Sequence, residues 1–487
     1  MWRTWAILVL VLLLAGSVGG NALFYGQARA ASADGDHQRA RALAAEQGQN
    51  TLQKRVDQLT AQNQRLQAAA PASGAGTPGS AAPAAPLPTV DAVGAAPMPL
   101  PPGFDQDLLL RMEGQVEVLR GLRVKSPVPL KLLDAAGLHA YFVDNFNRDY
   151  PQEERDADQK LLTSLGLLGP NDDLVQIELD LLQEQVIGVY SEDDKTMYLV
   201  GDPSHFGPDE KGTFVHEYAH ALQDQYFDLA TLSPKHPDND DQAQAIQGLT
   251  EGDATLLQRL WSQANLTPGE IAQLGQGGAN SKLSQAPLVI REQLLFPYVE
   301  GFNFVHQVYQ TGAGYASVNE LFRKPPASTS QVLHPDKYLA GTRPADVTLP
   351  DVAAAMGEGW RTIRSNVLGE FELRVVLEQF TDATRAARGT DGWAGDRWQL
   401  LEKDGKQALV MRSEWSSENA ARTFFDTYGV ALANRFGGAK REEASSTRQA
   451  LTAATSATEL RITGRDVLAV ISFDRASAEA LALAAGS

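Results

Sequence analysis

The sequence predicts a mixed α+β protein whose folded part follows an N-terminal transmembrane helix and a stalk helix. Segments with helical apolar spacing dominate residues 104–350, whereas β-type runs separated by turn residues recur in residues 351–487. An apolar run of about twenty residues lies near the N-terminus. Hydrophobic residues make up 43% of the 487 positions, which is enough to form a sizeable core.

Composition excludes several classes of protein. The chain has no cysteine, which rules out disulfides, iron–sulfur clusters, cysteine-ligated zinc and thiol catalysis. The formal net charge is −18, and residues 1–70 carry seven Lys or Arg against four Asp or Glu. The remainder is therefore strongly acidic and repels phosphate backbones, so we expect no nucleic-acid partner.

Residues 1–30 are predicted to form a membrane anchor. Trp5–Phe24 is uncharged and mostly aliphatic, and Arg3 precedes it, as expected for a cytoplasmic start. We therefore expect a single-pass protein of the cell membrane with an extracytoplasmic body. The alternative is a signal peptide cleaved at Ala28-Arg29-Ala30, which would release a secreted protein.

Residues 31–70 and 71–103 are predicted to form a stalk and a linker. Leu52, Val56, Leu59, Asn63 and Leu66 follow heptad spacing, and a buried Asn favours a two-stranded register. The stalk is therefore either a short coiled coil that makes a homodimer or a single solvated helix. In residues 71–102, 22 of 32 positions are Ala, Pro or Gly, which predicts an extended tether.

One motif carries recognisable chemistry. Gly207-Pro208-Asp209-Glu210 is a good helix start, and it leads into His216-Glu217-Tyr218-Ala219-His220. Two histidines four residues apart on a helix place both imidazoles on one face, where they can bind the same metal ion. Glu217 lies beside them, able to take a proton from water. The pattern H-E-x-x-H is that of zinc peptidases, with Glu217 as the catalytic base.

Two histidines leave a catalytic zinc site one protein ligand short. Gln223 and Tyr226 stand where a metzincin would have Gly and His, and a second helical stretch at about 243–264 carries Glu251-Gly252-Asp253-Ala254. Together with the first motif, this string resembles the gluzincin metallopeptidases, whose third ligand is a downstream Glu. The resemblance implies a zincin-like helical domain at 104–350 with Zn²⁺ on His216, His220 and Glu251. The long interval after His220 leaves Asp253 or Asp224 open as the third ligand.

Asp224 and Asp253 are predicted to support the ligands. Asp224 follows His220 by one turn, so we expect it to orient an imidazole; the alternative is a solvated helix acid. Asp253 points about 200° around the helix from Glu251, so both cannot bind one ion. We expect Asp253 to accept a hydrogen bond from an imidazole N–H.

A β-hairpin is predicted just before the motif helix, from Ile187–Ser191 and Thr196–Val200 joined by a turn at 192–195. By the same resemblance, its edge strand would receive an extended peptide substrate. Zincins also use a Tyr or His to stabilise the oxyanion. Four residues are candidates, although each is also explained by packing: Tyr298, His306, His334 and Tyr338.

Residues 351–487 are predicted to form a second α+β domain. We expect a long helix from Trp360 to about Arg388, a hairpin of 397–402 and 408–415 around Asp404-Gly405, and a helix at 417–436. Strands at 459–463 and 467–473 and a last helix follow. Trp360, Trp393, Trp398 and Trp415 are predicted to pack in the core of this sheet.

The expected function is that of a membrane-tethered, extracytoplasmic zinc peptidase acting on a protein or peptide. Two alternatives are an inactive zincin fold serving as a surface or envelope scaffold and a zinc hydrolase of a non-peptide amide. The intact Glu217 argues against the scaffold, because a disused site has no chemical need for a base.

Overall fold

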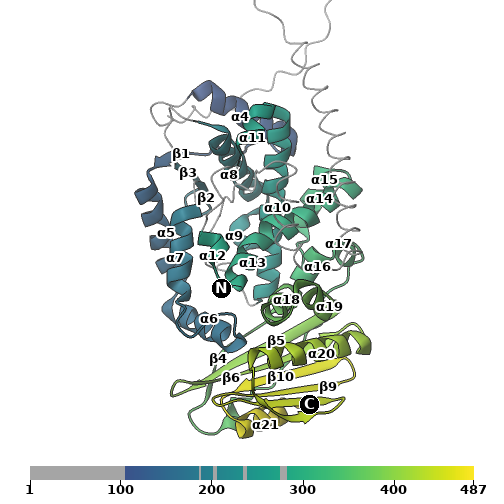
Figure 1. The fold of residues 1–487 in the computed structure, drawn as a ribbon. Coiled ribbons are helices and arrows are strands. Elements are labelled where there is room, and N and C mark those ends of the chain that lie inside the picture. Colours follow the sequence, from purple (N-terminus) through teal and green to yellow (C-terminus); the bar gives the residue numbers. More distant parts are fainter. Residues whose placement is uncertain (1–104, 186–187, 201–205, 234–238, 275–281, 487) are drawn as a thin grey trace, which may run out of the picture.

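A computed structural model of the chain describes residues 105–185, 188–200, 206–233, 239–274 and 282–486 (Figure 1). The predicted membrane helix, stalk and linker lie outside these residues. Among the described helices, none combines the length and the apolar character needed to cross a membrane. The fold is α+β: a mainly helical body is followed by a C-terminal third built on a large sheet.

The body contains helices packed around two central ones, α8 and α10. The helical elements are α4 (Gln106–Arg120), α5 (Ala135–Asp149), α6 (Gln152–Leu165), α7 (Leu174–Gln185), α8 (Pro208–Phe227), α9 (Leu229–Leu232), α10 (Asp240–Asn265), α11 (Pro268–Gln273), α12 (Lys282–Gln285), α13 (Leu288–Phe296), a π-helical turn η1 (Pro297–Gly301), α14 (Phe302–Thr311), α15 (Tyr315–Arg323), α16 (Thr329–Leu333) and α17 (Pro335–Leu339).

A three-stranded sheet lies beside α8. Its strands are β1 (Leu130–Leu133), β2 (Gly188–Ser191) and β3 (Thr196–Val200), in the order β1-β3-β2. The β2–β3 pair is the predicted hairpin, with Val189 opposite Tyr198. Strand β1 adds in parallel to β3, so β2 forms the edge of the sheet that contacts α8.

Helix α8 begins where its sequence predicts, α10 begins at Asp240 rather than at about 243, and both are unusually buried. Pro208 occupies the first turn of α8, and the Asn239 side chain caps α10 by accepting from the Gln242 amide. Every residue from Gly212 to Asp224 is buried, as expected for a helix enclosed by other elements rather than lying on the surface.

Glycines allow η1 to approach α10 very closely. A methyl group added at Gly252 would lie 2.3 Å from the Gly301 carbonyl oxygen, and one at Gly301 would lie 2.1 Å from that of Gly248. Backbone therefore packs on backbone at this crossing. The contact brings η1 against the part of α10 that carries Glu251.

The C-terminal third is a seven-stranded sheet in the order β4-β5-β6-β10-β9-β8-β7, with all neighbours antiparallel. Its elements are η2 (Ala353–Met356), β4 (Arg361–Asn366), α18 (Gly369–Phe380), α19 (Ala383–Thr390), β5 (Trp393–Lys403), β6 (Lys406–Trp415), α20 (Glu418–Arg435), β7 (Lys440–Ala444), β8 (Arg448–Thr452), β9 (Ala457–Thr463), β10 (Asp466–Ser472) and α21 (Arg475–Ala484).

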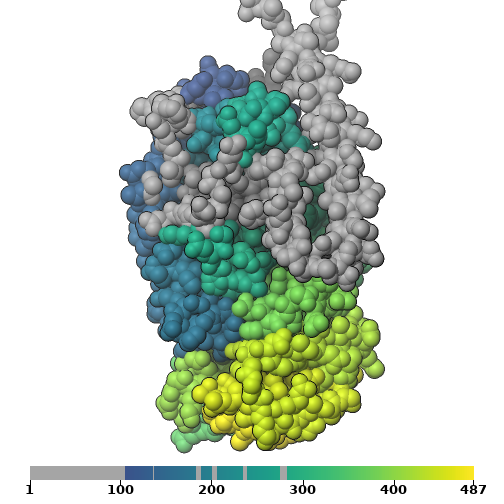
Figure 2. Space-filling view, in the orientation of Figure 1, coloured from purple at the N-terminus to yellow at the C-terminus, as the bar shows by residue number. Residues whose placement is uncertain are grey.

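Helices cover both faces of this sheet. Along β6, Leu409 and Met411 join the cluster shared with α20, whereas Ala408 and Val410 join the cluster shared with α21. Trp393, Trp398 and Trp415 are buried in the first of these clusters, which confirms their predicted packing role. In the space-filling view, this third forms one end of the molecule (Figure 2).

One prediction for this region was wrong, and two strands were not predicted. The expected helix from Trp360 to Arg388 is instead β4 followed by α18 and α19. The break falls at Gly369, where φ is +80°. Strands β7 and β8 were not predicted, because β7 is a charged and largely exposed edge strand without apolar alternation.

The helical body and the C-terminal third share one hydrophobic cluster. Helix α18 packs on α13 and α16, and α6 contacts β6. Arg364 of β4 adds polar contacts across this junction, forming ion pairs with Asp158 of α6 and with Asp240 of α10, the latter at 2.7 Å. The sheet therefore supports the end of α10 nearest its N-terminus.

Candidate metal centre

Helix α8 presents His216, Glu217 and His220 from its buried middle. The exposed fractions of the three residues are 1%, 0% and 5%. The two imidazoles lie one turn apart, with ring centroids 4.8 Å from each other. Buried polar side chains need partners, so the surroundings of these three residues define the site.

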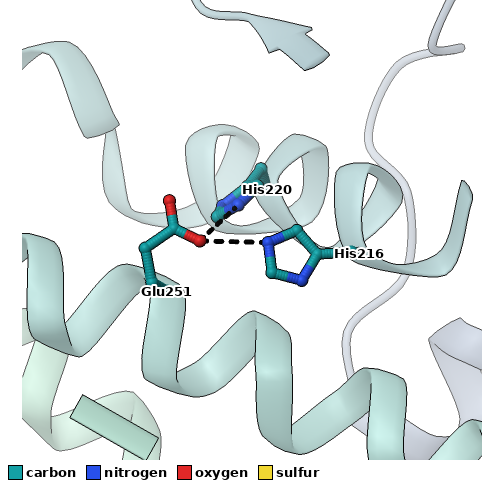
Figure 3. Close-up of side chains that lie close together, drawn as sticks. All are labelled: His216, His220 and Glu251. Carbon is teal, nitrogen blue, oxygen red and sulfur yellow. Dashed lines mark hydrogen bonds and ion pairs between the residues drawn. The ribbon is translucent and has the colours of Figure 1, made fainter. Parts of the chain in front are cut away.

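Glu251 of α10 points at both imidazoles (Figure 3). Its Oε2 atom lies 3.0 Å from His216 Nε2 and 3.4 Å from His220 Nε2. One ligand atom from each residue lies within 4.8 Å of the others, and all three residues are buried. The structure thus brings together the three residues that the sequence predicted as ligands. Asp224 and Asp253 do not belong to this group.

The donor set fits a zinc ion. Ligand atoms about 2.1 Å from a tetrahedral zinc are about 3.4 Å apart, close to the separations seen here. Two imidazole nitrogens and one carboxylate oxygen are ligands that zinc accepts in catalytic sites. In addition, the buried His220 Nε2 has no hydrogen-bond partner among the described residues. A buried His/His/Glu group of this kind could hold a metal ion.

The imidazoles and the Glu251 carboxylate shift each other's pKa values. Burial alone would lower the pKa of His220, but the Glu251 carboxylate outweighs it and raises that pKa. Burial likewise would raise the pKa of Glu251, yet the two imidazoles hold it well below its usual value. Both shifts favour a proton shared within the group in the absence of metal, and metal binding would compete with that proton.

The two carboxylate oxygens of Glu217 differ in their hydrogen bonding within the described residues. Oε2 accepts a hydrogen bond of 2.6 Å from the Tyr190 backbone N–H on edge strand β2. Oε1 is buried without a hydrogen-bond partner among the described residues. Burial raises the pKa of this carboxyl group. Glu217 is thus fixed in place while keeping an oxygen able to hold a proton.

Asp253 does not contact an imidazole directly, which corrects the prediction for this residue. Its Oδ2 accepts a hydrogen bond of 2.9 Å from Gln223 Nε2, and it forms a buried ion pair with Arg120 of α4. Gln223 Oε1 in turn lies 2.9 Å from His220 Nδ1. Sequence analysis missed Gln223, because the sequence shows only an amide side chain three residues after His220. The contact of Gln223 with Asp253 depends on how α10 packs against α8.

The prediction for Asp224 was also wrong. Its Oδ2 accepts hydrogen bonds from the Tyr190 hydroxyl at 2.7 Å and from Lys195 Nζ at 2.6 Å. Its Oδ1 accepts from the Leu229 amide. Asp224 is buried rather than solvated, and it attaches the β2–β3 hairpin to α8 instead of orienting an imidazole.

Of the four Tyr and His candidates for oxyanion stabilisation, Tyr298 lies against the site. Its ring stacks on His216 with centroids 6.1 Å apart. His306 stacks on Phe302, His334 bonds to Glu370, and the Tyr338 hydroxyl donates to the Lys324 carbonyl. Tyr298 belongs to η1, and short π-helical segments are frequent at functional sites.

Comparison with known protein families gives a match in the C-terminal third. A family model described as a domain of unknown function (DUF8575) matches residues 358–482, which corresponds to the sheet of the C-terminal third. Neither the curated proteins nor the solved structures contain a match to the chain. The residues of the candidate metal centre lie outside the matched segment.

Proposed function

We propose that this chain is a zinc-dependent peptidase tethered to the cell membrane, with its body on the extracytoplasmic side. The observation that carries the proposal is the convergence of His216, His220 and Glu251 next to Glu217. The tether and the location rest on the apolar run Trp5–Phe24. The proposed substrate is a protein or peptide.

Each residue has a distinct role in the proposal. His216, His220 and Glu251 would hold zinc, which when bound polarises a carbonyl group and lowers the pKa of water to about 7. Glu217 would accept the proton of the attacking water on Oε1 and return it to the leaving amine. Its raised pKa suits a group that must both take and release a proton.

The edge strand provides support for a peptide substrate. Strand β2 lies at the edge of its sheet, and its Tyr190 amide bonds directly to Glu217. An extended peptide that paired with this edge would run beside the base and the proposed zinc ligands.

The test is metal analysis and proteolysis on the same sample of purified full-length chain. We expect about one zinc per chain and cleavage of unfolded protein substrates that a chelator abolishes. His216→Ala and His220→Ala should each remove the zinc. A wild-type protein that binds no zinc would contradict the proposal, and one that binds zinc without hydrolysis would favour the scaffold alternative.

A further inference from the structure

We infer that Gln223, held in place by Asp253 and Arg120, is a positioning residue that selects the tautomer of His220 for metal binding. The inference rests on the metal site of the proposed function and does not depend on the substrate. It assigns a role to four buried polar side chains from three helices, none of which would touch the ion except His220.

The orientation of the Gln223 amide is determined by its surroundings. One face meets the Thr250 backbone carbonyl at 3.0 Å and Asp253 Oδ2 at 2.9 Å. A backbone carbonyl can only accept, so the group directed at it must be the NH₂. The carbonyl oxygen of the amide, Oε1, is therefore the atom that faces His220 Nδ1.

An acceptor facing Nδ1 determines the chemistry of the ring. His220 must carry a proton on Nδ1 in order to donate to Gln223 Oε1. The neutral imidazole then has its lone pair on Nε2, which is the nitrogen that faces Glu251. Nδ1 remains a donor whether Nε2 carries a proton or a metal ion, so the hydrogen bond persists in both states.

Arg120 and Asp253 keep this acceptor aligned. Arg120 Nε donates to Asp253 Oδ2 at 3.1 Å, and the two residues are 1% and 0% exposed. The guanidinium is fixed in turn by α15, because it donates to Asn319 Oδ1 at 2.7 Å and lies over the Tyr315 ring at 4.5 Å. A rigid ion pair thus holds the far side of the amide.

The hydrogen-bonded series from Arg120 through Asp253 and Gln223 to His220 also differs in charge from a direct carboxylate–histidine contact. The negative charge of Asp253 is compensated by Arg120, and a neutral amide separates both from the imidazole. His220 is therefore oriented without an additional net charge next to the ligands. Orienting partners of this kind affect metal affinity by about 10- to 100-fold.

The test compares Gln223→Leu with Gln293→Leu in the full-length chain. Gln293 is a matched control, because it is also a buried amide that donates to a buried acid, Glu372, but it belongs to α13. We expect Gln223→Leu to weaken zinc binding about 10- to 100-fold in a competition titration with a chromophoric chelator, and Gln293→Leu to leave it unchanged.

A second readout reports on the ring itself. In Co²⁺-loaded protein, the exchangeable imidazole N–H protons give paramagnetically shifted NMR signals, and Gln223→Leu should shift or remove one of them while Gln293→Leu preserves all. If Gln223→Leu does not fold, Gln223→Met retains the length of the side chain but offers no carbonyl acceptor to His220 Nδ1, and it should weaken zinc binding as well.

These experiments distinguish a failure of the role of Gln223 from a failure of the proposed metal site. Wild-type zinc affinity and unchanged N–H signals in the Gln223 variants would overturn the role of Gln223 while leaving the metal site intact. A wild-type chain without zinc would instead overturn the metal site on which the proposed function rests.

Discussion

At the scale of single residues, the candidate site contains few side chains, each with a separate task. His216, His220 and Glu251 converge on one point, and Glu217 is held beside them by the amide of β2. Helix α8 carries two of the ligands and the base, whereas α10 supplies the third ligand and β2 holds the Glu217 carboxylate. Substitutions should therefore separate metal binding from turnover.

Glu217→Gln tests that separation. The amide retains the size of the side chain and can still accept from the Tyr190 N–H, but it cannot take up a proton. We expect zinc content and melting temperature to match those of the wild type, with turnover at least about 10²-fold lower. Hydrolysis at the wild-type rate would show that another group is the base.

Residue spacing in the sequence predicted only part of this site. The pair His216 and His220 follows from helical periodicity, because positions four apart share a face whatever packs around them. Gln223 could not be found in this way, since its contacts come from Asp253 and Thr250 on another helix. Asp224 was assigned by the same periodicity, but the neighbouring hairpin supplies it with Tyr190 and Lys195.

At the scale of elements, the site depends on how α10 packs between α8 and η1. Glu251 reaches the histidines from α10, while the next residue, Gly252, lies against the Gly301 backbone. Prediction succeeded for α8 and α10 because their caps and apolar periods are local signals. It failed for β4, whose partner β5 follows two intervening helices, and for the β7–β8 hairpin, because β7 is a charged and largely exposed edge strand.

Gly252→Ala should disturb this packing. Its added methyl group would lie 2.3 Å from the Gly301 carbonyl oxygen, so η1 or α10 must shift. We expect the free energy of unfolding to fall by at least about 2 kcal/mol, with weaker zinc binding.

The control is Gly114→Ala in α4, another helical glycine with no atom within 4 Å of the added methyl group. Because Ala favours helix over Gly, this variant should be neutral or stabilised by up to about 1 kcal/mol in urea unfolding. Equal stabilities of the two variants would contradict the close approach of η1.

At the scale of the whole molecule, acidic side chains are buried where α10 meets the C-terminal third. Asp241 accepts hydrogen bonds from the Thr329 amide at 3.0 Å and from the Thr329 hydroxyl. Burial raises the pKa of Asp241 to about 8, and Asp396 and Glu370 nearby add to the effect. Glu370 is itself bonded to His334 and Lys337.

Asp241 should therefore make stability fall as pH rises. The folded-state pKa of about 8 lies above the ordinary value of 3.8, so the folded chain binds the proton more tightly than the unfolded chain. The stabilisation is complete below about pH 4 and is lost as the pH rises through about 8.

Asp241→Asn should remove this dependence, because an amide cannot ionise yet retains the oxygen that faces Thr329. Relative to the wild type, the variant should gain about 1 kcal/mol per pH unit between pH 5 and 8 in urea unfolding. A stability difference that does not change with pH would show that Asp241 is not protonated in the folded chain.

Crystallography can show whether His216, His220 and Glu251 together bind one zinc ion, as we propose. An anomalous difference map at the zinc absorption edge, from crystals of protein purified without chelator, should show one peak about 2.1 Å from His216 Nε2, His220 Nε2 and a Glu251 carboxylate oxygen. A peak coordinated by other residues, or no peak at these three side chains, would contradict the claim.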